Sequence, residues 1–477
     1  MTTFDRLTQR LSVTLILILG VMLLVPVRVG ARPARSAVPH LGYGFNVAEW
    51  DIDRLQAMGF NWIKVFDAPS TPLPILVLLR VDVTAQTSMN DLLADLEAKL
   101  AYKDNVAAWE IGNEPNLDAS YGWAAAPNAV DYTRLLCAAY TRLKQADPGA
   151  IVVSAGLAPT GRVTGDWNGH PGHNGLYQDE REYLKELFEA GGGACLDAVG
   201  YHPYGYSADY NAAPDVASTD STQNCANGFC FRGAEKIYEI MQARGAGDKK
   251  LWATEFGWIT SPPDDCLADG SWSGRQWQIV SADKQASNLA GAYQYADAYW
   301  PWMGALFIFN LNFNVAPWYD NPCEQMLFYS VQGRPAESAL TALVKNIPSL
   351  AGRLKTDTTA IQWRVDVNEQ PITLTASVDL ANWGWGSLVY TATVDAAASV
   401  APTISNPTGS LSATAQTYLS LSLSTFTHTG TLALGTYTGT LTLNWYAVGA
   451  GNNPRLIALQ VDVVPEVYRV YLPATVK

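Results

Sequence analysis

The chain has 477 residues, a length that suits one large domain followed by a smaller one. Its hydrophobic content of 48% and its 16 tryptophans provide material for a core and exclude wholesale disorder. A formal charge of −13 argues against a nucleic-acid partner, because an acidic surface repels the phosphate backbone, so an uncharged or weakly polar substrate fits better.

Residues 1–31 have the layout of a secretory signal peptide. Two arginines precede an apolar run over residues 11–27, and small residues follow it before a cut after Ala31 or Ala37. The alternative is an uncleaved anchor, for which the apolar run is marginal in length. We therefore expect a secreted or cell-surface monomer without a cofactor, which contacts a membrane only if that anchor is retained.

The six cysteines are an even number in a chain expected to be exported, which indicates disulfide bonds. The first predicted pair, Cys225–Cys230, brackets a short loop. The second, Cys266–Cys323, joins two polar loops that follow apolar runs. No Cys-x-x-Cys pair has the spacing of a zinc site. The remaining two are equally compatible with buried free thiols: Cys137 and Cys195.

Residues 38–353 alternate short apolar runs with helical patterns. The runs are apolar on both faces, as in buried parallel strands, and nearly all are followed by a helix. Eight such units in about 310 residues predict an α/β fold, a (β/α)₈ TIM barrel rather than an open doubly wound sheet. The expected strands are residues 42–46, 61–66, 74–81, 106–112, 151–156, 196–202, 251–256 and 305–310. The expected helices are residues 52–58, 89–101, 129–145, 181–190, 233–244, 284–299 and 335–346.

The composition changes after the barrel region. Residues 396–454 contain no Asp, Glu, Lys or Arg, and apolar and polar residues alternate over 417–427 and 435–445. This period of two predicts an all-β sandwich over residues 356–465, followed by a tail over 466–477. The stretch "GTYTGTLTL" resembles the closing strands of BACON-type or related immunoglobulin-like modules on secreted carbohydrate enzymes.

Two glutamates fall at predicted strand ends. Glu114 follows the fourth strand, and Glu255 ends the seventh. A TIM barrel opens all its strand ends onto one face, where such barrels hold their active sites. Cleavage of a glycosidic bond needs one acid that protonates the leaving oxygen and one carboxylate that attacks the sugar. Taken alone, Glu114 fits equally well a carboxylate at a helix start, whereas Glu110, inside the strand, is expected in a buried ion pair.

Three motifs at these strand ends resemble those of clan A glycoside hydrolases, the retaining 4/7 superfamily, and are closest to families 39 and 5. They are "GNEPN" (112–116), "GYHPYG" (200–205) and "TEFGW" (254–258), and they occur in the order of that superfamily. The resemblance covers about residues 40–350 and implies a TIM barrel that hydrolyses β-glycosides.

The resemblance also implies the role of each residue. Glu114 would be the general acid/base and Glu255 the nucleophile. Asn113 would hydrogen-bond the 2-hydroxyl of the bound sugar. His202 and Tyr204 would orient the two carboxylates from the sixth strand.

The chain departs from the family pattern at two places. Lys64 stands where many members carry a strand-two arginine, and Arg80 is a second candidate for the positive charge near the nucleophile. The tryptophan that many members place on strand eight is replaced in this chain by Phe309 or Asn310. These departures affect how the substrate is oriented, and both cations are predicted to bind it.

Six tryptophans lie in predicted loops on the catalytic face. Each is either a platform for a sugar ring or part of the packing of a long loop, and we expect about half to be core. Trp258, next to the nucleophile, is the one predicted to bind substrate. The histidines of "HPGH" (170–173), near Asp166, lack a third ligand, so no metal site is predicted. The six are Trp123, Trp167, Trp258, Trp272, Trp277 and Trp318.

The sequence therefore predicts a retaining glycoside hydrolase that cleaves β-linked polysaccharides or oligosaccharides by double displacement. The alternative is a non-catalytic carbohydrate-binding or cell-surface protein that keeps the barrel. Transglycosylation would use the same residues and would differ in how well water is excluded.

Overall fold

The computed structural model describes most of the chain beyond residue 38. The predicted signal peptide and the predicted tail lie outside the described residues. No helix in the described part of the chain has the length and apolar character that a membrane crossing requires. The described residues are 39–71, 73–147, 149–220, 223, 225–347, 354–356, 358–382, 388–412, 415–424, 426–427, 430–447 and 454–465.

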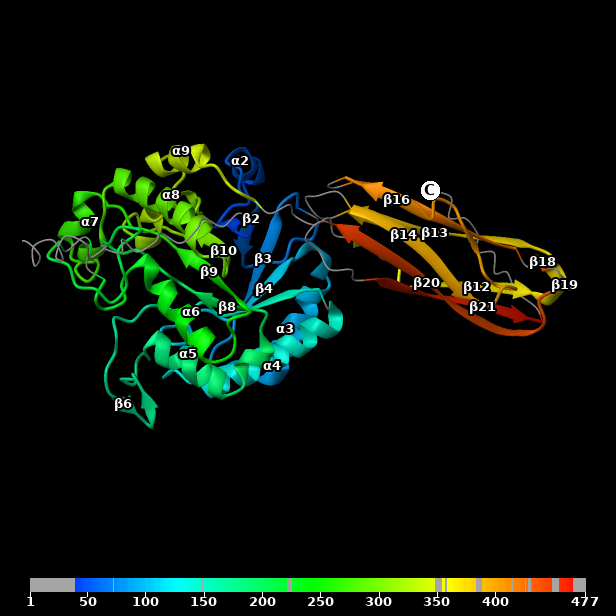
Figure 1. Ribbon diagram of the computed structural model, residues 1–477, viewed down its shortest axis with the longest axis horizontal. Coiled ribbons are helices and arrows are strands. Elements are labelled where there is room, and N and C mark those ends of the chain that lie inside the picture. The colour runs from blue at the N-terminus through cyan, green and yellow to red at the C-terminus, as the bar shows by residue number, and fades with distance from the viewer. Residues whose placement is uncertain are drawn as a thin grey trace, which may run out of the picture. The chain divides into compact units, whose positions relative to one another are not determined.

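Eight parallel strands close into a barrel in the order β1-β10-β9-β8-β5-β4-β3-β2 (Figure 1). The barrel closes where β1 pairs with β10, with Gly42 opposite Ala305. Each strand overlaps its predicted run, with β9 and β10 beginning one and two residues earlier than expected, so the predicted TIM barrel is confirmed. The strands are β1 (Gly42–Asn46), β2 (Trp62–Val65), β3 (Leu76–Val81), β4 (Ala108–Ile111), β5 (Ile151–Ser154), β8 (Ala198–Tyr201), β9 (Lys250–Phe256) and β10 (Met303–Ile308).

Helices surround these strands (Figure 1). They bury apolar stripes at helical spacing, such as Leu92, Leu96 and Leu100 on α3. The side chains of Ser88, Asn128, Asp179 and Ser281 cap the free N–H groups of four of them. The seven predicted helices are α2 (Ile52–Ala57), α3 (Met89–Leu100), α4 (Ala129–Ala146), α5 (Glu180–Glu189), α6 (Ala234–Ala243), α8 (Ala282–Tyr299) and α9 (Pro335–Ala342).

The loops contain short elements that the sequence patterns did not predict, among them a hairpin and a short helix. A two-stranded hairpin, β6 (Asp166–Trp167) with β7 (His170–Pro171), lies between β5 and α5. The short helix α7 (Asp264–Ala268) lies in the loop after β9. Each is too short to give a readable period, because a period needs several repeats to stand out.

The inward-facing side chains change from apolar to charged along the strands. Trp62 on β2 and Ala108 on β4 belong to a buried apolar cluster. Lys64 and Glu110 follow them by two positions and therefore point to the same side of their strands. The end of the barrel interior toward the C-terminal strand ends thus holds charged groups, where barrels of this kind hold their chemistry.

The C-terminal region is all-β, as predicted. Buried residues from two sheets, such as Leu419 on β17 and Leu441 on β20, form one apolar core. The first sheet is β11 (Leu354–Lys355), β13 (Thr373–Asn382), β17 (Gln416–Ser424) and β15 (Thr403–Ile404). The second is β12 (Ala360–Asp366), β21 (Arg455–Val464), β20 (Gly435–Ala447), β14 (Leu388–Ala396) and β16 (Thr408–Leu411). A two-stranded sheet adds β18 (Phe426–Thr427) and β19 (Gly430–Thr431).

Three disulfide bonds tie the barrel region. Cys225–Cys230 and Cys266–Cys323 form as predicted. Cys137 and Cys195, for which free thiols stood as an alternative, also form a bond, which joins α4 to the turn before β8. The Cys266–Cys323 bond joins α7 to the loop that follows β10.

Candidate active site

Glu114 lies just beyond the C-terminal end of β4. Its φ is 41°, in the left-handed region that a residue with a Cβ rarely adopts, and Gly112 just before it has φ 86°. The N–H of Glu114 donates to the carbonyl of Gly156 at 3.0 Å, which holds this turn against β5. The local backbone is therefore held in an uncommon conformation at the residue expected to act as the acid.

Glu255 lies near the end of β9 and is 7% exposed. The Tyr204 hydroxyl donates to its Oε2 at 2.8 Å, and Lys64 Nζ lies 3.0 Å from its Oε1. Burial alone would raise the pKa of Glu255, but the charges of Lys64 and His202 outweigh it and lower that pKa. Glu255 is therefore an ionised carboxylate with a fixed orientation.

Lys64 bridges two buried carboxylates. Its Nζ lies 2.7 Å from Oε2 of Glu110, and neither side chain is exposed. Burial alone would raise the pKa of Glu110, but Lys64 and His202 lower it to about 2. The predicted buried ion pair of Glu110 is confirmed.

The two candidate cations have different partners. Lys64 makes the ion pair with Glu255, and because its side chain is fully buried and does not line the cavity, its prediction as a substrate-binding residue is wrong. Arg80 pairs instead with Asp82, 2.8 Å from Nε to Oδ1, and stacks over the Phe66 ring at 4.7 Å. Arg80 still lines the cavity above the site, so it can contact a bound substrate there.

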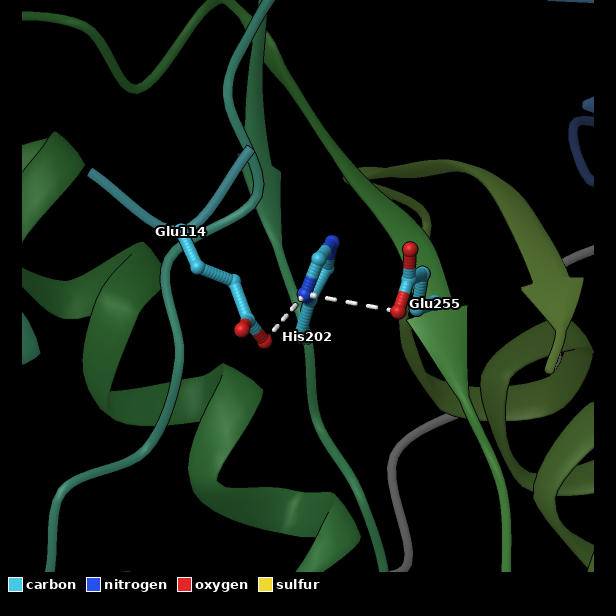
Figure 2. Close-up of side chains that lie close together, drawn as sticks. All are labelled: Glu114, His202 and Glu255. Carbon is cyan, nitrogen blue, oxygen red and sulfur yellow. Dashed lines mark hydrogen bonds and ion pairs between the residues drawn. The ribbon is translucent and has the colours of Figure 1, made fainter. Parts of the chain in front are cut away.

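His202 lies between the two predicted catalytic carboxylates (Figure 2). Its Nδ1 is 2.9 Å from Oε1 of Glu114 and 3.7 Å from Oε2 of Glu255, and its Nε2 is 3.1 Å from the Thr254 hydroxyl. Burial alone would lower the pKa of His202, but the neighbouring carboxylates raise it to about 9. His202 is therefore an imidazolium at neutral pH.

Gly156 makes the position of His202 possible. A Cβ at residue 156 would lie 2.1 Å from His202 Nε2 and 2.6 Å from the Thr254 hydroxyl oxygen. Both contacts are far below van der Waals distance, so only glycine leaves room for the ring.

One carboxylate oxygen of Glu114 and one of Glu255 lie within 4.8 Å of each other. The same two residues and His202 form a potential metal-ligand group. With its raised pKa, His202 would have to lose a proton before its ring could ligate a metal. In the "HPGH" loop, His173 Nδ1 accepts from the Gly175 N–H at 2.8 Å, and Nε2 lies 3.2 Å from the Pro127 carbonyl, so both of its nitrogens are occupied.

A cavity of about 620 Å³ opens over the carboxylates. Asn113 lines it, and its Nδ2 donates to the Tyr121 carbonyl at 2.9 Å. The buried Asn113 Oδ1 has no hydrogen-bond partner among the described residues, so it is available to a ligand hydroxyl. Ten aromatic side chains contribute to the lining: Phe66, Tyr121, Tyr204, Tyr206, Phe229, Trp277, Phe309, Phe313, Tyr319 and Tyr329.

The tryptophans divide as expected, with half of them in the core. Trp123, Trp258 and Trp272 are at most 3% exposed, whereas Trp167, Trp277 and Trp318 are at least 38% exposed. Of the six, Trp277 lines the cavity.

The structure places Trp258 away from the cavity, contrary to its prediction as a substrate-binding residue. It is fully buried and its Nε1 donates to the Ala208 carbonyl at 2.8 Å. Gly205 provides its space, because a Cβ there would lie 1.8 Å from the indole. Trp258 follows the end of β9 but turns into the packing between barrel and helices.

The sequence motifs did not identify several of the residues that line the cavity. Phe309 lines the cavity, whereas Asn310 is buried and hydrogen-bonds the Met326 carbonyl at 3.0 Å. Tyr206 was not predicted as a site residue, although "HPYGY" ends in a second tyrosine that could have indicated it, and Trp277 was only one of six candidate sugar platforms. The conformation of the loops decides which of these rings reaches the cavity, and the periodicity of the local sequence does not predict that conformation.

No protein-family model matches this chain, and no curated protein matches it. Solved structures match at low identity. An endo-β-1,3-glucanase of glycoside hydrolase family 128 from Amycolatopsis mediterranei, in complex with laminaritriose, is 13% identical with a TM-score of 0.39, covering 64% of this chain and 100% of that one.

Two further solved structures also match this chain at low identity. A calcium-binding mutant of β-glucuronidase 2 from Bacteroides uniformis is 13% identical with a TM-score of 0.39, over 89% of this chain, which spans only 46% of that protein. A PapD-like domain of human CEP192 is 12% identical with a TM-score of 0.21, over 24% of this chain and 89% of that domain. At these sequence identities and TM-scores, the similarities concern the fold alone.

Proposed function

We propose that this protein is a retaining glycoside hydrolase that cleaves β-glycosidic bonds of a polysaccharide or oligosaccharide. The observation that carries the proposal is the pair Glu114 and Glu255, whose nearest oxygens lie within 4.8 Å inside an aromatic-lined cavity. Retaining enzymes hold their two carboxyl groups about 5–5.5 Å apart, whereas inverting enzymes leave about 6.5–9.5 Å for a water molecule. The short spacing favours direct attack by one carboxylate.

Glu255 is the nucleophile in this proposal, and Glu114 is the acid/base. Glu114 gives its proton to the leaving oxygen while Glu255 attacks the anomeric carbon and forms a glycosyl–enzyme ester. Glu114 then takes a proton from water, which attacks the same carbon and releases the sugar with its original configuration. Lys64 keeps Glu255 ionised, and Tyr204 orients its attacking carboxylate.

The remaining predicted site residues have supporting roles. Asn113 Oδ1 accepts from the sugar 2-hydroxyl, consistent with its free acceptor in the cavity wall. His202 holds the Glu114 carboxylate at a fixed place through Nδ1. Arg80 offers donors to sugar hydroxyls from the cavity rim.

We propose the following organisation for the chain. Residues 1–31 direct export and are removed, residues 38–353 form the catalytic barrel, and residues 356–465 form an immunoglobulin-like accessory module. Three disulfide bonds fit an oxidising compartment outside the cell. The protein acts as a monomer on a β-linked glycan without a cofactor.

The test is hydrolysis of a panel of aryl β-glycosides and β-glucans, with the configuration of the first product followed by NMR. We expect retention by the wild type and no turnover by Glu255→Gln. Glu97 on α3, whose side chain is 65% exposed and pairs with Arg142, is the control, and Glu97→Gln should keep wild-type rates. Glu114→Ala should regain turnover of an activated aryl glycoside when azide replaces water as the second nucleophile. If wild type and Glu255→Gln both bind sugars and neither hydrolyses any, the protein is a carbohydrate-binding protein instead.

A further inference from the structure

Trp277 lines the cavity and is held by neighbouring aromatic rings. It lies in the loop after β9, lines the cavity and is 49% exposed. Its ring stacks on Tyr206 at 5.3 Å with an interplanar angle of 7° and contacts Phe229 at 5.3 Å. Its Nε1 donates to the Gly274 carbonyl at 3.1 Å. An indole held by two rings and a hydrogen bond forms a ready platform for a flat apolar surface.

Two polar side chains from the same loop line the same cavity. Gln278 is 7% exposed, and its Oε1 has no hydrogen-bond partner in the described part of the structure. Leaving a buried acceptor without a partner is unfavourable, so the site favours a ligand that brings a donor. Arg275 adds guanidinium N–H donors to the cavity wall.

This loop adjoins the catalytic carboxylates. The guanidinium of Arg275 lies close enough to the Tyr329 hydroxyl to offset part of the rise that burial causes in its pKa. Tyr329 packs edge-on against Tyr204 at 5.4 Å, and the Tyr204 hydroxyl holds Glu255. Only two side chains therefore separate Arg275 from the nucleophile, so one ligand can reach both places.

We propose that Trp277, Gln278 and Arg275 form a subsite for an uncharged pyranose unit next to the cleaved bond. The C–H face of a pyranose is apolar and stacks on the indole, while its hydroxyls both donate and accept. A carboxylate or phosphate would place its oxygens against the lone pairs of Gln278 Oε1. It would also enter a cavity in which the three carboxylates of Glu114, Glu255 and Glu324 outnumber the two guanidinium groups of Arg80 and Arg275, which disfavours an acidic sugar. The proposal rests on the function proposed above and narrows its substrate to neutral oligosaccharides of two or more units.

The experiment separates binding from turnover. Binding is measured by calorimetry on Glu255→Gln with cello-, laminari-, xylo- and manno-oligosaccharides of two to six units. Adding Trp277→Ala should weaken binding of the best series on the order of tenfold, which corresponds to about 1.4 kcal/mol. Adding Trp277→Tyr, which keeps a ring, should lose much less. Gln278→Leu should weaken binding severalfold.

Trp167 provides the matched control. It is 38% exposed and stacks on His173 at 4.8 Å, but it does not line the cavity, so Trp167→Ala should leave binding unchanged. Each variant is checked by its circular dichroism spectrum and melting temperature. If the loop collapses in Trp277→Ala, Trp277→Tyr still tests the subsite, because it keeps an aromatic ring at this position.

The subsite and the function fail in distinguishable ways. If the wild type hydrolyses substrate and Trp277→Ala binds oligosaccharides as tightly as Trp167→Ala, the subsite is overturned and the proposed hydrolase stands. Trp277-dependent binding without wild-type turnover supports the subsite and overturns the hydrolase. Absence of binding to all four neutral series, or tighter binding of an oligouronide probe, overturns the subsite.

Discussion

Replacing Lys64 with methionine tests how the buried nucleophile stays ionised. The side chain has no exposed surface, and its Nζ lies 2.7 Å from Glu110 and 3.0 Å from Glu255. At an effective dielectric constant of about 20, each attraction is worth about 6 kcal/mol. Relief of the desolvation of the ammonium group offsets several kcal/mol of this. We therefore expect Lys64→Met to lower the free energy of unfolding by about 3–5 kcal/mol.

The same substitution should change the pH dependence of catalysis. Without Lys64, burial and the charge of Glu110 both raise the pKa of Glu255. A nucleophile must be ionised, so the acidic limb of kcat/KM should move to higher pH. The measurements are urea unfolding followed by fluorescence and a pH profile of hydrolysis with an aryl β-glycoside.

A surface lysine serves as the control for Lys64. Lys185 pairs with Glu182 on α5 at 2.8 Å, and Lys185→Met should cost no more than about 1 kcal/mol. Adding Glu110→Gln to Lys64→Met should restore part of the lost stability, because it removes one of the two buried negative charges left behind. Equal urea midpoints for Lys64→Met and Lys185→Met, with an unmoved acidic limb, would refute the reasoning.

Three further predictions follow from the same cluster. Tyr204→Phe removes the hydroxyl that donates to Glu255 at 2.8 Å, and kcat should fall roughly 10- to 100-fold with little change in melting temperature. Gly156→Ala would place a Cβ 2.1 Å from His202 Nε2, so turnover should be lost. Urea titration should show the free energy of unfolding lowered by about 1–3 kcal/mol. The pH dependence of stability has two limbs. The pKa of Glu110 is lowered to about 2, so its contribution to folding stability is complete above its ordinary pKa of 4.5 and is lost as pH falls toward 2. His202, with its pKa raised to about 9, stabilises fully below its ordinary value of 6.5 and loses that contribution as pH rises, so melting temperatures should be highest between these two ordinary values.

The barrel could be predicted because its information is local and repeated. Each strand is a short run apolar on both faces, and most are followed by a stripe such as that of Leu92, Leu96 and Leu100 on α3. The buried ion pair of Glu110 was predictable for a related reason, since a carboxylate inside an apolar strand must find a cation. Its partner Lys64 required the closed barrel, because 46 positions separate the two residues in the sequence.

The aromatic lining could not be predicted with the same success. Trp258 and Trp277 both lie beyond β9 in loops, and composition treats them alike. The first turns into the core because Gly205 leaves space for it, and the second stacks on Tyr206 and faces the cavity. These outcomes depend on contacts between loops far apart in the sequence, which no pattern along one segment contains.

The charges of the buried cluster suggest why the proposed mechanism needs so many of them. Glu110, Glu114 and Glu255 face Lys64 and His202, three carboxylates against two cations. Before reaction, a protonated Glu114 leaves two negative and two positive charges. After the first step Glu255 is an ester and Glu114 is ionised, so the cluster again holds two negative and two positive charges. In the proposed mechanism Glu255 loses its charge by forming the ester bond while Glu114 gains one by giving its proton to the leaving oxygen. The cluster is therefore electrically neutral at both stages, and no uncompensated charge arises in a buried site.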